Sequence, residues 1–350
     1  MVSPIELAGR MVGPGHPCFI VAEAGVNHNG DITLAKRLID AAAEAGADAV
    51  KFQTFQAERL VTATAPKARY QTRTTDGGES QLEMLRRLEL SPHAHRLLAD
   101  YCRQRRVLFL STPFDEKSAD LLSELGVAAF KVSSGDLTNL PLLTHVARKG
   151  KPVILSTGMS TLHEVKTAVR AVQAAGVGSL IILHCVSSYP AAAADANLRA
   201  MHTMAAALKL PVGYSDHTMG IEVALGAAAL GACVLEKHLT LDRTLPGPDQ
   251  AASVEPAEFA TLVHGVRLIE AALGDGRKVP TPDEREVAEV ARRSLVAARH
   301  IPVGTTLTEE LIAVKRPGTG LPPAMLPEVV GRRALKDIAE GTVLTRDMVA

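Results

Sequence analysis

Short apolar segments rich in β-branched residues recur along the first 241 residues and alternate with longer amphipathic segments. There are eight of them, at 18–25, 49–55, 107–114, 129–136, 152–159, 180–189, 211–218 and 233–241. The segments between them repeat their apolar residues with the helical period. Eight strand–helix units in about 250 residues match a closed (β/α)8 barrel, and no G-x-G-x-x-G turn follows the first strand. We therefore expect an α/β protein whose larger domain is a TIM barrel.

The pattern changes near the C-terminus. Residues 274–293 are polar and contain two prolines, Pro280 and Pro282, which predicts a linker with a short helix. The remaining residues, 294–350, contain two similar segments, IPVGTTLTEELI at 301–312 and IAEGTVLTRDMV at 338–349. The sequence thus predicts a barrel domain over 1–273, a linker and a small, two-lobed β-rich domain.

Charge and cysteine content narrow the possible functions. The chain has 38 Lys and Arg against 38 Asp and Glu, so nothing favours nucleic acid or an anionic membrane as the main partner. The apolar runs are too short to span a bilayer and the N-terminus lacks a signal-peptide pattern, so we expect a cytoplasmic protein. Cys18, Cys102, Cys185 and Cys233 lie far apart, which is typical of reduced core thiols.

Two lysines interrupt apolar strands, Lys51 in AVKFQTF and Lys131 in AFKVSSGD. A lysine inside a barrel needs a partner charge, because burying it unpaired is costly. An anionic ligand would supply that charge, and the alternative is an internal ion pair with Glu23 or Glu236. The long segment 70–89 between the second and third strands predicts a loop or lid over the same end of the barrel, where TIM-barrel active sites lie.

Hydroxyl side chains lie at the ends of four strands, at Thr112, Ser134, Ser156 and Ser215. A single serine in such a place is most often a helix N-cap. Four of them converging near two lysines describe a cradle for a phosphate or carboxylate group. Because strict alternation would put Lys131 and Ser134 on opposite faces, we expect the strand to end before Ser134.

Two histidines end the last two strands, His217 in YSDHT and His238 in LEKHLT. Adjacent strands bring them close enough to share a divalent ion, although hydrogen-bonded histidines without a metal would give the same pattern. Two imidazoles and no thiolate favour Mn²⁺ or a similar octahedral ion over structural zinc. Alternation points Glu236 inward with His238, and Glu23 gives a second inward carboxylate, so either could act as a general base.

Together these motifs resemble the N-acetylneuraminate synthase family of sialic and nonulosonic acid synthases, over nearly the whole chain. The tail from about Ser294 resembles the antifreeze-like (SAF) domain that follows the barrel in that family. The motifs are AEAGVNHNG at 22–30, KFQTF at 51–55, STPFD at 111–115, KVSSGD at 131–136, LSTGM at 155–159, HCVSSYP at 184–190, YSDHT at 214–218, LEKHLT at 235–240, GPD at 247–249 and KRPGTG at 315–320.

The resemblance implies condensation of phosphoenolpyruvate with N-acetylmannosamine and water to give N-acetylneuraminate and phosphate. It implies that His217 and His238 bind Mn²⁺, and that Glu23 or Glu236 transfers protons, with Glu23 the better candidate for activating water. The residues that match phosphoenolpyruvate-binding positions are Lys51, Thr112, Lys131, Ser134, Ser156 and Ser215. The remaining predicted substrate-binding residues are Gln53, Ser187, Tyr189 and Asp249.

Arg316 matches an arginine that the family's antifreeze-like domain inserts into the barrel of the other subunit, where it contacts the N-acyl group of the sugar. The resemblance therefore implies a domain-swapped homodimer in which Arg316 acts in trans. From the sequence alone, Arg316 would be an ordinary surface arginine.

Several alternatives remain open. Ser187 stands where sialic acid synthases have an asparagine and Ser133 where a glycine is familiar, and the S-S-Y-P form also resembles legionaminic and pseudaminic acid synthases. Those enzymes imply a 2,4-diacetamido-2,4,6-trideoxyhexose as the acceptor sugar. A different class of enzyme, a Schiff-base aldolase, could use Lys51 or Lys131 as its nucleophile. A carbohydrate-binding or ice-binding protein without enzymatic activity is the alternative outside enzymes.

Overall fold

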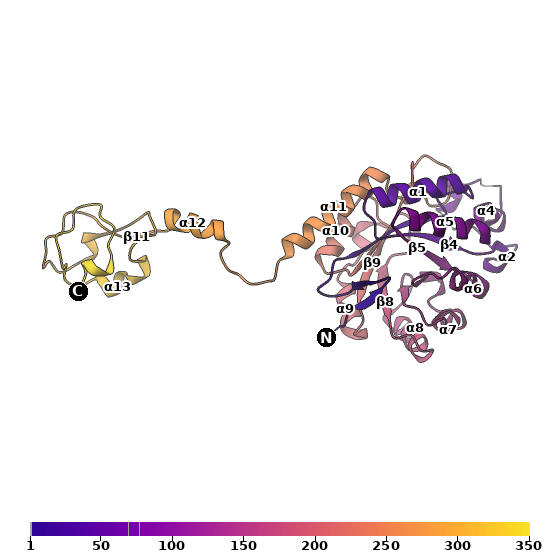
Figure 1. Cartoon of the computed structure of the whole chain (residues 1–350), viewed down its shortest axis with the longest axis horizontal. Helices are drawn as coiled ribbons and strands as arrows, with labels where there is room; N and C mark the ends of the chain where they lie inside the picture. Colours follow the sequence, from indigo (N-terminus) through magenta and orange to yellow (C-terminus); the bar gives the residue numbers. More distant parts are fainter. Residues whose placement is uncertain (1, 69, 77) are drawn as a thin grey trace. The chain divides into compact units, whose positions relative to one another are not determined.

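The structure is a computed structural model that describes residues 2–68, 70–76 and 78–350, without the side chain of Arg73. The chain divides into two compact units, Met1–Gly274 and Asp275–Ala350 (Figure 1). No helix within the described residues is both long and apolar enough to cross a membrane. All four cysteines are free and buried, as expected of core thiols.

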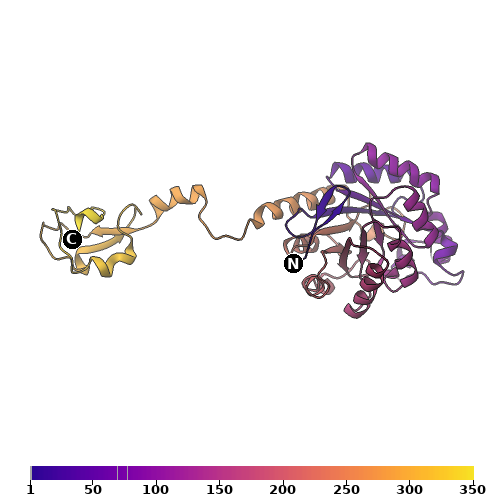
Figure 2. The same ribbon diagram turned by 60° about the horizontal axis from the view of Figure 1, so that its bottom comes forward.

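The larger unit is built on eight parallel strands, one for each predicted apolar segment. Their hydrogen-bonded order is β5-β4-β3-β10-β9-β8-β7-β6, and β5 packs beside β6, so the sheet closes into the predicted barrel. Figure 2 shows the strands inside this unit with helices around them. The strands are β3 Phe19–Gly25, β4 Ala49–Thr54, β5 Leu108–Pro113, β6 Phe130–Val132, β7 Val153–Ser156, β8 Leu180–Cys185, β9 Val212–Asp216 and β10 Val234–His238.

An outer layer of helices packs against the strands, and a large apolar core lies between the two layers. Several of these helices begin at a side-chain cap. For α1, the side chain of Asp31 caps the first turn by accepting from the backbone N–H of Thr33, so Thr33 is inside the helix. The outer helices are α1 Ile32–Glu44, α5 Pro92–Gln104, α6 Glu116–Glu124, α7 Leu140–Ala147, α8 Leu162–Ala174, α9 Ala200–Leu208, α10 Glu222–Ala229 and α11 Pro256–Leu273.

A second, smaller apolar core fills the barrel interior toward the amino ends of the strands. Leu7 and Val12 belong to it, and they come from an N-terminal hairpin of β1 (Ile5–Leu7) and β2 (Arg10–Val12). The sequence analysis did not predict this hairpin. Because these apolar residues fill the amino end, ligands can enter the barrel only from the carboxyl ends of its strands.

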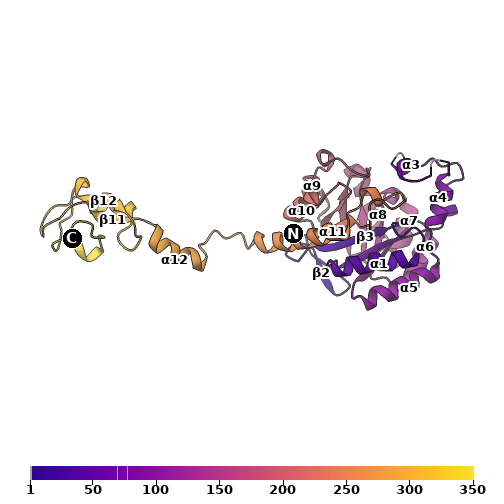
Figure 3. The ribbon, with the colours of Figure 1, turned by 90° about the horizontal axis from the view of Figure 1, so that it is seen from above.

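The segment 70–89, predicted as a long loop or lid, contains two short helices, α3 Gln71–Thr74 and α4 Gln81–Leu88. Another short helix, α2 Ala57–Leu60, precedes it in the same connection. The α4 helix begins at a capping box in which Ser80 and Glu83 satisfy each other's backbone N–H groups. Figure 3 shows α3 and α4 next to each other at one edge of the barrel unit.

The smaller unit has one apolar core, to which both segments of its internal repeat contribute. It contains α12 (Pro282–Ala291), the antiparallel pair β11 (Ser294–Ala297) and β12 (Ile312–Lys315), and α13 (Leu326–Val329). Ile301 and Ile338, the first residues of the two repeats, exchange backbone hydrogen bonds of 2.8 and 2.9 Å. Equivalent residues of the two repeats thus face each other about this pair.

Candidate active site

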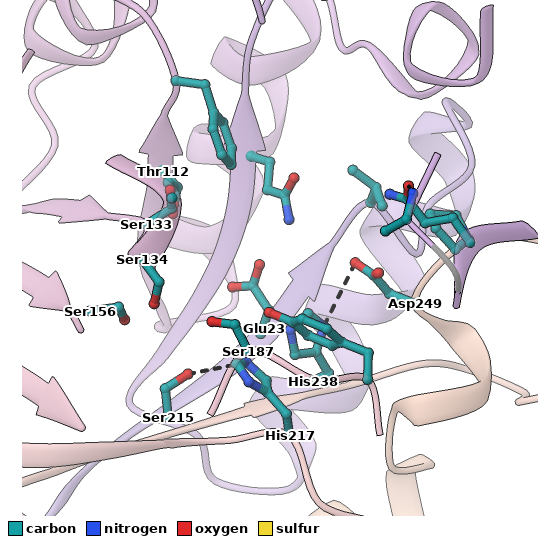
Figure 4. Close-up of a pocket in the computed structure, with 18 of the residues that line it drawn as sticks. Glu23, Thr112, Ser133, Ser134, Ser156, Ser187, Ser215, His217, His238 and Asp249 are labelled. Carbon is teal, nitrogen blue, oxygen red and sulfur yellow. Dashed lines mark hydrogen bonds and ion pairs between the residues drawn. The ribbon is translucent and has the colours of Figure 1, made fainter. Parts of the chain in front are cut away.

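A cavity of ≈490 Å³ opens at the carboxyl ends of the barrel strands. Figure 4 shows Ser133, Ser134 and Ser156 on one side of Glu23, with Asp249 on the other. Every predicted site residue of the barrel lines this cavity: Glu23, Lys51, Gln53, Thr112, Lys131, Ser134, Ser156, Ser187, Tyr189, Ser215, His217, Glu236, His238 and Asp249.

Strand alternation places the charged residues in one layer. Lys51 on β4 and Lys131 on β6 each stand two residues after an alanine of the inner apolar core, Ala49 and Ala129, the latter directly before β6. Ser134 is not part of this alternation, because β6 ends at Val132 and Ser134 begins a 3-10 helix. The expectation that the strand ends before Ser134 is therefore confirmed.

Both lysines form internal ion pairs. The Nζ of Lys51 contacts a carboxylate oxygen of Glu23 and lies 3.7 Å from Oε2 of Glu236. The Nζ of Lys131 lies 3.2 Å from Oε1 of the same Glu236. The internal pairing considered as an alternative is thus present, and the demand of two buried lysines for charge does not by itself require a ligand.

The pKa values of the two glutamates differ. Burial raises the pKa of Glu23 to about 7, although Lys51 opposes the shift. Burial also disfavours the charged form of Glu236, but Lys131 and Lys51 outweigh it and lower its pKa to about 2. When Glu23 is protonated, Glu236 is therefore the one carboxylate shared by two ammonium groups, and the cluster has a positive surplus that suits an anion.

The hydroxyl groups around the cluster are bonded to different extents. Thr112 accepts from Lys51 at 3.1 Å, and Ser215 donates to Glu236 at 3.0 Å. The buried Oγ of Ser156 has no hydrogen-bond partner among the described residues. Because a buried polar group without a partner costs free energy, Ser156 is a ready donor for a ligand oxygen.

Ser134 sits against the backbone of the neighbouring strand end. Its Oγ accepts from the N–H of Gly158 at 2.9 Å and lies 3.1 Å from the Sγ of Cys185. A Cβ at Gly158 would lie only 2.2 Å from the Oγ of Ser187, so the close approach of these groups requires glycine there. The result is a dense set of hydroxyl and backbone donors beside the lysines.

The two histidines lie side by side, with ring centroids 5.5 Å apart. The Nδ1 of His217 bonds the carbonyl of Val186 at 2.7 Å, and its Nε2 has only a long contact of 3.5 Å to Oγ of Ser215, whose proton goes to Glu236. That long contact leaves the Nε2 available to a ligand. The buried Nδ1 of His238 has no hydrogen bond and lies 4.0 Å from Oδ2 of Asp249. Burial lowers the pKa of both histidines, so they are neutral, as metal ligands must be.

These features fit a divalent ion held by two protein ligands. The unpartnered ring nitrogen of His238 and the weakly bonded Nε2 of His217 can bind one ion. Within the ranges that the structure describes, no group of three or more His, Cys, Asp or Glu residues could hold a metal. Water or substrate oxygens would have to complete the coordination.

Aromatic and apolar residues that the sequence analysis missed complete the cavity. Tyr70 lies 5.0 Å from Tyr189 between ring centroids, and Tyr189 lies 4.3 Å from His217. Gln71 and Gln81 add amide groups from the same connection as Tyr70. An apolar wall is formed by Val26, Met84, Leu85, Leu88 and Phe114.

Arg316 is the one predicted site residue that does not belong to the barrel unit. It follows β12 in the smaller unit and is exposed there. The structure describes a single chain, so a role for Arg316 in trans stays a prediction.

Comparison with known proteins decides the family. The model of the NeuB family matches residues 38–278, and that of the SAF domain matches residues 292–350. The chain belongs to the NeuB family. It is therefore a transferase-type enzyme with a C-terminal SAF domain, as the motifs predicted.

Full-length relatives support the assignment. The chain is 47% identical to an N,N'-diacetyllegionaminic acid synthase of Legionella pneumophila over 95% of its own length and 94% of the relative's. It is 40% identical to the N-acetylneuraminate-9-phosphate synthase of Mus musculus, covering 99% and 97%. A solved structure of an N-acetylneuraminic acid synthetase from Leptospira borgpetersenii, in complex with citrate, superposes with a TM-score of 0.73 at 40% identity, covering 83% and 96%. NeuB family members thus match nearly the whole chain.

Proposed function

We propose that this enzyme condenses phosphoenolpyruvate with a 2,4-diacetamido-2,4,6-trideoxymannose-type sugar and water, giving N,N'-diacetyllegionaminic acid and phosphate. The resemblance of the motifs to sialic acid synthases implied N-acetylmannosamine as the acceptor. The 47% identity to a legionaminic acid synthase, against 40% to the murine neuraminate-9-phosphate synthase, favours the diacetamido sugar instead. N-Acetylneuraminate synthesis is the second candidate, supported by the 40% identical solved synthetase.

The observation that carries the proposal is the pair of buried lysines around one ionised carboxylate. In the proposed complex, Lys51 and Lys131 bind the anionic groups of phosphoenolpyruvate, and the unpartnered hydroxyl of Ser156 donates to one of their oxygens. Thr112 and Ser134 supply further hydroxyl groups beside the lysines.

Condensation requires carbon three of phosphoenolpyruvate to attack the sugar aldehyde. His217 and His238 would hold Mn²⁺, which supplies Lewis-acid polarisation of the aldehyde oxygen when bound. The aldehyde oxygen takes up a proton as the C–C bond forms. Water then adds at carbon two and gives up one proton. Phosphate leaves with the electron pair of the C–O bond, and the hydroxyl at carbon two loses its proton and becomes the keto group. Glu23 takes the proton of this water in its ionised form, because a pKa of about 7 keeps both its forms populated at neutral pH, while Glu236 stays ionised and positions both lysines.

The test uses the full-length, chelator-stripped protein with phosphoenolpyruvate, with and without Mn²⁺. The two acceptors are 2,4-diacetamido-2,4,6-trideoxymannose and N-acetylmannosamine, and phosphate release and product mass are measured. We expect a higher kcat/KM for the diacetamido sugar and no ¹⁸O in phosphate when the reaction runs in H₂¹⁸O. If neither sugar supports the release of phosphate, the proposal is refuted. If the released phosphate contains ¹⁸O, cleavage of the C–O bond is refuted.

The aldolase alternative is tested in the same preparation. A Schiff base requires a neutral lysine, but Glu23 and Glu236 outweigh burial and raise the pKa of Lys51. We expect borohydride to trap no adduct between the enzyme and a keto acid. A trapped adduct on Lys51 or Lys131 would support the aldolase.

We further propose that the enzyme works as a domain-swapped homodimer in which Arg316 contacts the acceptor in the other subunit. Mixing an Arg316→Ala variant with a His217→Ala variant then restores part of the activity, because a mixed dimer contains one intact site. Lack of restoration, with mixed dimers shown to form, argues against the swap.

A further inference from the structure

A second cavity of ≈380 Å³ lies beside the first. Met84, Leu88 and Pro248 line both cavities, so the two share a wall. We call the second one the side cavity. Its lining residues are Asn29, Thr74, Thr75, Asp76, Met84, Arg87, Leu88, Pro246, Gly247 and Pro248.

One wall of the side cavity is fixed by hydrogen bonds between distant segments. The Nδ2 of Asn29 donates to the carbonyl of Pro246 at 2.8 Å, and Gln250 donates to Oδ1 of Asn29 at 3.3 Å. A Cβ at Gly247, whose φ is +144°, would lie 2.8 Å from that Oδ1. The wall therefore has a defined shape in the absence of a ligand.

The segment that carries Thr74 is also fixed. The side chain of Lys67 is almost fully buried and donates to Thr75 Oγ1 at 3.1 Å, to the carbonyl of Asp76 at 2.6 Å and to Glu79 at 2.9 Å. Glu79 in turn pairs with Arg87 at 2.6 Å. Because these bonds fix the residues that directly follow α3 and connect them to α4, Thr74 holds its place at the side cavity.

The side cavity combines one unsatisfied polar atom with apolar surface. The Oγ1 of Thr74 is buried and has no hydrogen-bond partner among the described residues. Met84 and Leu88 are apolar and belong to the cluster that packs under the connection. Arg87 and Asp76 carry opposite charges, and Arg87 is paired with Glu79, so the walls do not select an anion or a cation.

We propose that the side cavity binds the acetamido group that a diacetamido acceptor carries and N-acetylmannosamine lacks, which makes Thr74 a specificity-determining residue. This inference rests on the proposed function. An acetamido group has one methyl and one amide, which match the apolar side chains of Met84 and Leu88 and the unpartnered hydroxyl of Thr74. A sugar with a hydroxyl at that carbon would leave the cavity unfilled, and a site built to hydrogen-bond a substrate discriminates against an analogue that lacks the group.

The first part of the test compares three acceptors with the wild-type enzyme. They are 2,4-diacetamido-2,4,6-trideoxymannose, 2-acetamido-2,6-dideoxymannose and N-acetylmannosamine. The first two differ only in the acetamido group at carbon four, so they separate its effect from that of the missing hydroxyl at carbon six. We expect kcat/KM to be at least tenfold lower for the second sugar than for the first. A smaller difference overturns the inference.

The second part measures the same ratio in variants. We expect Thr74→Val, which removes the hydroxyl at almost constant volume, to lower the ratio of kcat/KM between the first two sugars about tenfold. Thr74→Ser keeps a hydroxyl and should hold the ratio near the wild-type value. Thr64→Val, at an exposed threonine on the same connection that lines neither cavity, is the matched control.

The outcomes separate the inference from the proposed function. If no acceptor is turned over, the proposed function fails and the inference fails with it. If the diacetamido sugar is a substrate but Thr74→Val leaves the ratio unchanged, or lowers kcat/KM equally for both sugars, only the inference is overturned.

Discussion

Lys131 and Lys237 are both buried lysines on barrel strands, and their surroundings differ. The Nζ of Lys237 donates to Asp216 at 2.7 Å and to the carbonyl of Thr218 at 2.6 Å. Asp216 also accepts from the N–H and the hydroxyl of Thr218, at 2.9 and 2.8 Å. In contrast, Lys131 has its nearest charged partner, Glu236, at 3.2 Å and shares it with Lys51.

The difference separates an ion pair that supports the fold from a cluster that can bind a ligand. The pair between Lys237 and Asp216 is closed, because one carboxylate serves one ammonium group and backbone groups satisfy both. Around Lys131, burial lowers the pKa of the lysine and raises that of Glu23, so charge in this cluster is incompletely compensated. An anionic substrate would compensate it.

The largest effect should come from breaking the closed pair. We expect Lys237→Met to lower the free energy of unfolding by about 3–5 kcal/mol, because it leaves Asp216 charged, buried and unpaired. The chain has no tryptophan, so unfolding is followed by far-ultraviolet circular dichroism against urea.

The double variant Lys237→Met/Asp216→Leu is the control for that prediction. Removing both charges takes away the unpaired group, and we expect most of the stability to return. A double variant no more stable than the single one would show that the contact between Lys237 and Thr218, and not the charge of Asp216, dominates.

Breaking the open cluster should affect activity more than stability. We expect Lys131→Met to lower kcat/KM about 10²–10³-fold, comparable to the loss of one donor in a preorganised anion site. The cost in stability should be smaller than for Lys237→Met, because Glu236 keeps Lys51 and Ser215 as partners. Steady-state kinetics and urea unfolding are measured beside Lys117→Met, an exposed lysine on α6. Equal losses of stability in the two buried-lysine variants would contradict the comparison.

The sequence predicted the barrel and its polar layer because both follow from strand alternation. The same rule could have found the closed pair, since Asp216 and Lys237 each follow an inward residue and stand opposite each other in the register of β9 and β10. The S-x-x-E pattern at Ser80–Glu83 likewise marks the start of α4. The loop or lid expected there followed from the length of the segment alone, without this capping pattern.

Other features could not be predicted from local sequence. The N-terminal hairpin closes the barrel through contacts with strands far along the chain, and its two strands have only three residues each. The side cavity forms where Asn29, Thr74 and Pro246 meet, and no periodic pattern connects these positions. The acceptor is equally non-local, because side chains from several connections decide which sugar fits.

The smallest effect concerns a hydroxyl that no protein group uses. Ser156→Ala breaks no hydrogen bond in the described structure, so we expect its free energy of unfolding to stay within about 0.5 kcal/mol of wild type. Its KM for phosphoenolpyruvate should rise about tenfold, which corresponds to about 1.4 kcal/mol of lost binding.

The matched control is Ser111→Ala, because Ser111 is buried on β5 and bonded to Thr54 at 2.7 Å. That variant should lose about 1 kcal/mol of stability with an unchanged KM. If both variants lost stability and neither changed KM, the free hydroxyl of Ser156 would not mark the substrate site. The cluster around Lys131 would then not differ from the pair of Lys237 and Asp216 by having an unsatisfied group for a ligand.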